Sequence, residues 1–201
     1  GIAPVDSAGV APAVTDAMSS GIPIIAIDTG VSGAEVTSFV ATDNYAVAKV
    51  QGAVAATLVN DGDTVIYVTG NQAQSTGQER RNGFMEAFSA ARPGSKILEV
   101  PTEWNSQQAQ EGVEAVLNSN SDVKMVVNAW DGGTMGAKAA LENLGYGAGD
   151  VKLVGFDGAS DAIAAMDEGW VHADTAQMLY QMGYQGIKAA AAAARGETVS
   201  S

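Results

Sequence analysis

The chain has 201 residues, and 46% of them are hydrophobic, which is enough to bury the core of one large α/β domain or two smaller ones. It carries 23 acidic and 10 basic residues, and this formal net charge of −13 argues against broad contact with nucleic acid or an anionic membrane. It contains no cysteine, so disulfides, thiolate chemistry and cysteine-based zinc sites are excluded. No apolar run approaches the ~20 residues that span a bilayer.

Short apolar runs alternate with amphipathic segments along almost the whole chain. We predict helices at residues 7–20, 43–59, 76–90, 106–119, 133–144, 160–168 and 179–195. We predict strands at residues 22–27, 35–41, 64–68, 96–100, 124–128, 151–156 and 172–175. This alternation is typical of parallel sheets covered by helices, so the predicted fold class is α/β with doubly wound parallel sheets.

Spacing also predicts helix faces and caps. In the helix at 43–59, one face carries Val47, Val50, Val54 and Leu58, and we expect that face to be buried. Aspartates that precede helices are most simply N-caps; they are Asp6, Asp43 and Asp131. Thr76 and Glu79 have the spacing of a capping box, with Thr76 as the N-cap.

The two ends of the chain differ from a complete doubly wound sheet. The first predicted helix has no strand before it, and residues 196–199 resemble a turn into a further strand. We therefore expect sequence to be missing at both ends. On that expectation, the lack of a signal peptide or of a DNA-binding head is not evidence about function.

Polar and aromatic residues follow three of the predicted strands. Asp28 and Asp157 each end an apolar strand, and Trp130 and Asp131 follow a third. Residues just past the strand ends line the ligand crevice of open α/β sheets. Three such ends predict a binding cleft.

Arg80 and two tryptophans have two interpretations each. Arg80 lies in the first turn of a predicted helix, where a cation opposes the helix dipole. It is either a surface arginine or a member of an ion pair, or it is a rigid fork that grips vicinal hydroxyls or a carboxylate. Trp104 and Trp130, in loops between predicted strands and helices, either pack in the core or stack on a sugar ring. Trp170 and the single histidine, His172, are interpreted as structural.

Motifs for catalysis are absent from the sequence. There is no G-x-S-x-G elbow, no Walker A motif, no H-E-x-x-H and no dense carboxylate cluster for a metal. We therefore predict that the protein is not an enzyme, with no catalytic residues, metal or cofactor.

In the order and spacing of several short motifs, the chain resembles the type I periplasmic binding proteins of sugar ABC transporters, and the ribose-binding branch in particular. The resemblance covers nearly the whole chain. The segments that carry it are residues 24–28 (IIAID), 41–44 (ATDN), 75–84 (STGQERRNGF), 154–158 (VGFDG) and 176–177 (AQ).

The resemblance implies roles for individual residues. Asp28 and Asp157 match carboxylates that accept sugar hydroxyls, and Arg80 matches a sugar-gripping arginine. Trp104 falls where an aromatic ring stacks on the sugar, and Gln177 matches a polar residue at the hinge crossover.

Two positions depart from the family pattern. Thr29 stands where the ribose-binding branch has an arginine, and Trp130 stands where many members have an asparagine. Both departures leave a pentose other than ribose, a hexose or a polyol open. Thr29, Phe156 and Asp131 are weaker ligand-binding candidates.

The resemblance also implies an organisation and a function. Residues 1–42 and 178–201 would form part of an incomplete N-terminal lobe, and residues 43–177 the C-terminal lobe. The protein would be a monomer that captures a monosaccharide or polyol between two lobes, closes about a hinge and docks on an ABC permease. It would be periplasmic or extracellular, with a lipid anchor left open, and this chain would bind no nucleic acid.

Two alternatives remain. The first is the sugar-sensing core of a LacI-type transcriptional regulator, which shares this fold. The second is a nucleotide-dependent enzyme on a flavodoxin-like sheet, which the absent phosphate loop disfavours.

Overall fold

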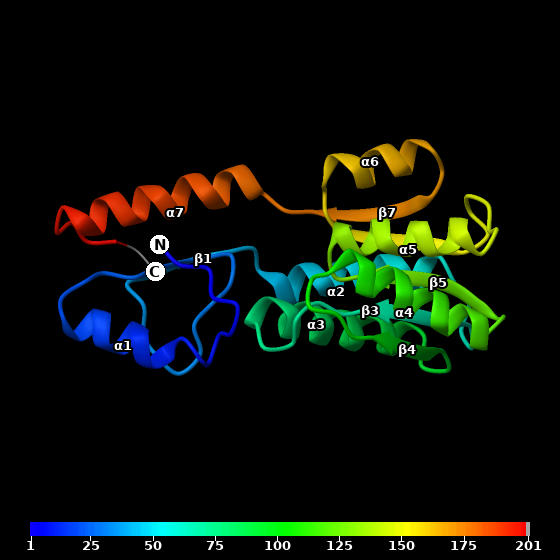
Figure 1. The fold of residues 1–201 in the computed structure, drawn as a ribbon, viewed down its shortest axis with the longest axis horizontal. Helices are drawn as coiled ribbons and strands as arrows, with labels where there is room; N and C mark the ends of the chain where they lie inside the picture. Colours follow the sequence, from blue (N-terminus) through cyan, green and yellow to red (C-terminus); the bar gives the residue numbers. More distant parts are fainter. Residues whose placement is uncertain (200–201) are drawn as a thin grey trace. The chain divides into compact units, whose positions relative to one another are not determined.

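The computed structural model of the protein describes residues 1–199, in which helices and parallel strands alternate (Figure 1). This confirms the predicted α/β class. The helices are α1 (Ala11–Ser19), α2 (Asn44–Thr57), α3 (Ser75–Ala91), α4 (Ser106–Ser119), α5 (Asp131–Asn143), α6 (Ser160–Asp167) and α7 (Leu179–Ala194). The strands are β1 (Ile25–Ile27), β2 (Ser38–Val40), β3 (Thr64–Val68), β4 (Lys96–Val100), β5 (Val123–Asn128), β6 (Lys152–Asp157) and β7 (Val171–Ala176).

The chain divides into two compact units. Unit 1 contains residues 1–44, residues 72–78 and the chain from Met178 onward. Unit 2 contains Tyr45–Asn71 and Glu79–Gln177. The grouping of residues 72–78 with unit 1 has no counterpart in the sequence-based division, and the assignment of lobes to residues 1–42 with 178–201 and to 43–177 stays a prediction.

Unit 2 is built on a five-stranded, all-parallel sheet in the order β4-β3-β5-β6-β7. Strand β3 is buried along its whole length, which explains why its sequence, TVIYV, reads as a continuous apolar run rather than an alternating one. Right-handed crossovers place α3 on one face of this sheet and α4, α5 and α6 on the other. The loops after β3, β4, β5 and β6 therefore meet at one edge of the sheet.

Helix α2 packs through small residues, and the predicted buried face is wrong. Val50 is 58% exposed and Val54 39% exposed, whereas Ala48, Gln51 and Ala55 are fully buried. Gly52 explains the difference, because a Cβ atom there would lie 2.9 Å from the Phe84 carbonyl oxygen of α3. The two backbones approach too closely for valines to fit between them.

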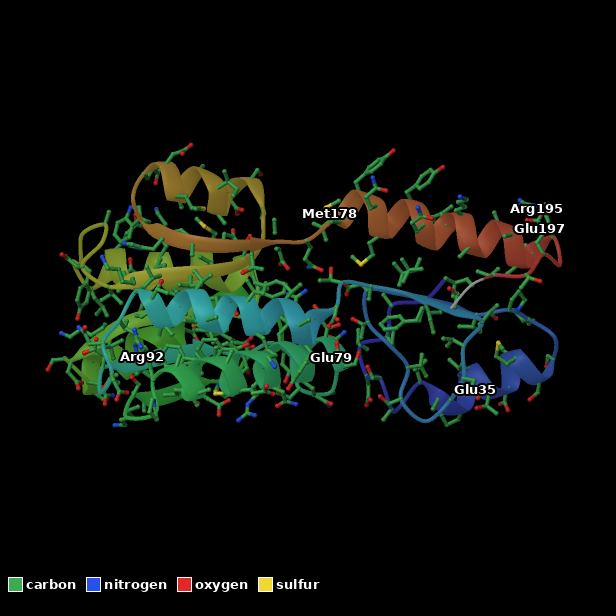
Figure 2. The ribbon with its side chains drawn as sticks, turned by 180° about the vertical axis from the view of Figure 1, so that it is seen from behind. Glu35, Glu79, Arg92, Met178, Arg195 and Glu197 are labelled. Carbon is green, nitrogen blue, oxygen red and sulfur yellow. The ribbon has the colours of Figure 1, made fainter. Side chains whose placement is uncertain are left out.

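The ends of α2 and α3 are also tied together. Figure 2 labels Glu79 and Arg92 near the two ends of α3. The Arg92 Nε donates to the Val59 carbonyl oxygen over 3.0 Å, just beyond the end of α2. This bond gives a partner to a carbonyl that lies beyond the hydrogen bonds of the helix.

The predicted caps are partly corrected. Helix α2 begins directly after Asp43, as expected. Asp6 instead binds the Ala8 and Gly9 N–H groups, in a turn that precedes α1. Thr76 lies inside α3 rather than before it, so it is not the N-cap.

Unit 1 contains a two-stranded parallel sheet of β1 and β2, extended by a bridge from Ile2 to Ala26. Figure 1 shows α7 on one side of this sheet and α1 on the other. Gly186 lets α7 approach the strand, because a Cβ atom there would lie 2.5 Å from the Ile27 side chain. None of the helices in residues 1–199 has the length and apolar character of a membrane span.

Candidate functional site

The candidate site of unit 2 is centred on Arg80, near the start of α3. Its side chain is only 3% exposed. One guanidinium nitrogen, Nη1, donates to the Ala129 carbonyl oxygen over 2.7 Å and to Asp157 Oδ1 over 3.0 Å. Arg80 is therefore not a surface residue but forms a buried ion pair with Asp157 at the end of β6, and its contact with a ligand stays a prediction.

Gln177 completes a polar triad with Arg80 and Asp157. Its side-chain amide donates to Asp157 Oδ1 over 2.6 Å, and its backbone N–H donates to the Asp157 carbonyl oxygen over 2.9 Å. The Asp157 side chain keeps 23% of its surface exposed. The carboxylate is thus held by an arginine and an amide while part of it still reaches the surface.

Aromatic rings flank the triad. The Trp104 and Trp130 rings meet edge to face, with centroids 5.3 Å apart and planes at 88°. The Arg80 guanidinium lies 4.0 Å from the Phe156 ring centroid and 5.7 Å from that of Trp104. Stacked and edge-on rings of this kind fix the orientation of the guanidinium.

Glycines make room for both tryptophans. A Cβ atom at Gly70 would lie 1.9 Å from the Trp104 ring. Cβ atoms at Gly132 and Gly133 would lie 2.6 Å and 2.7 Å from the Trp130 ring. The two rings therefore fit only because the residues beside them, in the loop after β3 and in the first turn of α5, are glycines without a side chain.

The backbone is strained at three of the predicted residues. Among residues 1–199, the non-glycine residues with positive φ are Asp28 (69°), Trp104 (57°) and Asp157 (132°). Such conformations cost about 1–3 kcal/mol each and cluster at functional sites. The sequence predicts each of them as a ligand-binding residue on other grounds.

Burial dominates the electrostatics of Asp157. Desolvation raises the pKa of its carboxyl, and the nearby Arg80 guanidinium and the Gln177 amide oppose that shift. The opposing contacts favour an ionised carboxylate that accepts hydrogen bonds.

Asp131 does not cap α5, which corrects its predicted role. It is the first residue of the helix, and Trp130 occupies the N-cap position. Its side chain is buried and contacts the end of β6, where Oδ1 accepts from the Phe156 N–H over 3.1 Å and Oδ2 from the Ala159 N–H over 2.7 Å. These bonds brace the turn that contains Asp157.

Asp28 and Thr29 lie in unit 1, at the end of β1. The Thr29 hydroxyl is buried, donates to Asp28 Oδ2 over 3.0 Å and lies 2.9 Å from the Thr76 hydroxyl. The Asp28 carbonyl oxygen accepts a further bond from Thr76 over 3.3 Å. Thr29 thus orients the Asp28 carboxylate, a task that its residue type did not suggest.

Sequence reasoning missed the packing of the Trp104 ring against Gly70, the Ala129 carbonyl and the buried carboxylate oxygens of Asp174. An isolated glycine after a strand was the only available signal for Gly70.

His172 lies 3.3 Å from the Lys152 ammonium, away from the triad, and burial lowers its pKa. Residues 1–199 contain no cluster of three side chains suited to holding a metal ion.

A polar triad with flanking aromatic rings, on the loops of a parallel sheet, is typical of proteins that bind small polar ligands. Comparison with protein families gives the particular class: residues 1–198 match the model of the periplasmic binding protein domain, and the chain belongs to that family.

Two relatives are named for the sugars that they bind. The ribose import binding protein RbsB of Escherichia coli (strain K12) is 32% identical over 198 residues, which are 98% of this chain and 66% of the relative. The D-allose-binding periplasmic protein of the same strain is 31% identical over 194 residues, covering 92% and 62% of the two chains. The chain thus spans just under two thirds of the length of these relatives.

Solved structures agree on the fold. A solute binding protein of an ABC transporter from Agrobacterium vitis, with bound D-fucose, superposes with a TM-score of 0.92 at 27% identity, over 98% of this chain and 69% of that one. Another from Mycobacterium smegmatis, with bound glycerol, gives a TM-score of 0.88 at 32% identity, over 99% and 69%.

Proposed function

We propose that the protein captures a monosaccharide or polyol for an ABC importer and catalyses no reaction. The observation that carries this proposal is the Arg80–Asp157–Gln177 triad beside Trp104, Trp130 and Phe156. Hydroxyl groups bond well to a carboxylate, an amide and a guanidinium, and aromatic faces cover the apolar C–H faces of a sugar ring.

The relatives support the same ligand class. Those described above are named for ribose import or D-allose binding, and the two solved structures hold D-fucose and glycerol. Thr29 and Trp130, which depart from the ribose-binding pattern, leave the particular sugar open. Asp28 is assigned to the ligand by resemblance, with Thr29 as its orienting partner.

The remaining parts of the proposal rest on the relatives. A permease partner follows from an import role, and the periplasm is the compartment in the name of the D-allose-binding relative. A monomeric state, a lipid anchor and closure about a hinge stay predictions. The LacI-type regulator is disfavoured because the related proteins described above are transport proteins.

The test is calorimetry on the whole protein, with pentoses, hexoses and polyols as ligands and with Arg80→Ala as the variant. We expect the loss of charge-assisted hydrogen bonds to cost about 2 kcal/mol or more in sugar affinity, which is a factor of about 30. Arg80→Lys keeps the charge without the planar fork, so it tests geometry apart from charge.

The neighbouring arginine provides a matched control. Arg81 pairs with Glu99 over 2.6 Å at the surface of unit 2, so Arg81→Ala should leave the affinity unchanged. Circular dichroism checks that Arg80→Ala still folds, because Asp157 loses its buried partner in that variant. Equal affinity of the wild type and a folded Arg80→Ala protein would contradict the assignment.

A further inference from the structure

Two carboxyl groups approach each other beside β6, behind the turn that contains Asp157. Asp174 lies on β7 and pairs in register with Gly155 of β6. A Cβ atom at Gly155 would lie 2.5 Å from Asp131 Oδ1 and 3.2 Å from Asp174 Cγ. The two acids therefore fill the space that a side chain at Gly155 would take.

The two acids have different hydrogen-bond donors. Each oxygen of Asp131 accepts a backbone N–H, from Phe156 and from Ala159. Both oxygens of Asp174 are buried and make no well-formed hydrogen bond within residues 1–199, although the backbone N–H groups of Thr175 and Gly158 lie near them. A buried carboxylate without a donor is costly, whereas a protonated carboxyl can itself donate to a neighbouring carboxylate.

The charges around the pair do not supply a counter-ion to Asp174. Besides the pair itself, the titratable groups on the surrounding elements are Asp157 and Lys152 on β6, His172 on β7, Asp161 and Asp167 on α6, and Lys138 and Glu142 on α5. Asp157 adds negative potential at both acids. Lys152 contacts His172, Lys138 pairs with Glu142, and Asp161 accepts from the Ala162 N–H.

We propose that Asp174 is a positioning residue that shares one proton with Asp131, and that the shared proton holds the turn from Asp157 to Ala159 in its ligand-binding shape. The stability consequence follows from the pair alone, whereas the effect on ligand binding rests on the function proposed above. Asp131 accepts hydrogen bonds from two N–H groups on either side of Asp157. A shift of the Asp131 carboxyl would therefore move the backbone that carries Asp157.

Burial supports the shared proton. It raises the pKa of Asp131 to about 7, and it raises the pKa of Asp174 as well, where the Asp131 side chain and then the nearby backbone N–H groups of Thr175 and Gly158 oppose the rise. Two adjoining carboxyls titrate as a pair, and the folded pair keeps a proton that both acids lose in the unfolded chain.

The sign of the pH dependence follows from these raised pKa values. Between about pH 4 and about pH 7 the folded protein binds about one proton more at this pair than the unfolded chain does. Stability is therefore highest at the acid end of this window and falls as the pH rises. The pair alone raises the unfolding equilibrium constant by up to about tenfold for each pH unit in this window.

The experiment is chemical denaturation of the whole protein at a series of pH values through this window. Asp174→Asn keeps a hydrogen-bond donor for Asp131 and removes the titration, so its stability should lose most of the wild-type dependence on pH. In Asp131→Asn the amide NH2 group would face one of the two backbone N–H groups that the carboxylate binds. We therefore expect this variant to be less stable at every pH of the series. Asp167→Asn, at an exposed position of α6, is the control and should keep the wild-type slope.

A ligand titration separates the positioning role from the shared proton. With a sugar that binds the wild type, the dissociation constant should rise at least threefold from about pH 6 to about pH 8 as the pair loses its proton, and Asp174→Asn should flatten that rise. If no sugar binds, the proposed function fails while the denaturation series still tests the proton. An Asp174→Asn protein with the full wild-type slope overturns the shared proton, and equal pH dependence of affinity in both proteins overturns the positioning role.

Discussion

At the scale of single residues, the site is defined by backbone conformation as much as by side-chain type. Asp28, Trp104 and Asp157 adopt positive φ although none is glycine. Strained conformations of this kind persist only where the surrounding structure fixes them. The groups that we propose for ligand binding are therefore held in place by the surrounding protein.

The close approach of the Trp104 ring to Gly70 gives a prediction at the scale of single residues. Gly70→Ala would place a Cβ atom 1.9 Å from the Trp104 ring, so the ring must move. We expect the displaced stacking surface to cost about 0.5–1.5 kcal/mol in sugar affinity, with a change in tryptophan fluorescence. Calorimetry and emission spectra of the variant provide the measurement.

The matched substitution is Gly147→Ala, in an exposed turn of unit 2. A Cβ atom there would meet the Asp150 carboxylate at 3.3 Å, far from any tryptophan contact described above. Its affinity and emission should match those of the wild type. A Gly70→Ala protein with wild-type affinity and emission would show that Trp104 does not depend on this glycine.

Single residues also show where sequence reasoning stops. Asp28, Arg80, Trp104 and Asp157 could be selected because strand ends and helix turns are readable from local patterns. The partners of Asp131 could not be predicted, because the N–H groups of Phe156 and Ala159 follow it by 25 and 28 residues. Its N-cap assignment used local sequence alone, and a tertiary contact overrode it.

At the scale of elements, prediction succeeded where the local sequence pattern is clear. Strands β3 and β4 and helix α4 have the predicted bounds, because short apolar runs and a clear amphipathic face leave few alternatives. It failed on the face of α2, where larger valines lie outside and small residues lie inside. Hydrophobic periodicity weights large side chains and so misses helices that pack through glycine and alanine.

The contact between α2 and α3 gives a prediction at the scale of elements. A Cβ atom at Gly83 of α3 would lie 2.3 Å from the Tyr45 carbonyl oxygen of α2. Alanine gains about 1 kcal/mol of helix propensity, but overpacking against a backbone atom costs about 1–3 kcal/mol. We expect Gly83→Ala to lower the free energy of unfolding by about 1 kcal/mol, measured by chemical denaturation.

An exposed helix position provides the comparison for Gly83. Asn118 lies on the solvent side of α4, and Asn118→Ala should change stability by no more than about 0.5 kcal/mol. A Gly83→Ala protein that is more stable than the wild type would mean that α2 and α3 separate at little cost.

At the scale of the whole molecule, net charge and ligand linkage distinguish the competing functions. The formal charge of −13 repels polyanions and leaves neutral sugars unaffected. A ligand that binds only the folded state raises stability according to its concentration relative to its dissociation constant. Thermal unfolding in the presence of sugars, nucleotides and duplex DNA can therefore compare all three classes in one assay.

The final prediction concerns that assay. A sugar at a hundred times its dissociation constant adds about 2.7 kcal/mol, which for a protein of this size raises Tm by about 5 °C or more. Arg80→Ala should reduce the shift at the same sugar concentration, because its occupancy falls, whereas Arg81→Ala should not. Nucleotides and DNA should leave Tm unchanged. A shift with DNA, with or without one from a pentose, hexose or polyol, would favour the regulator over the importer.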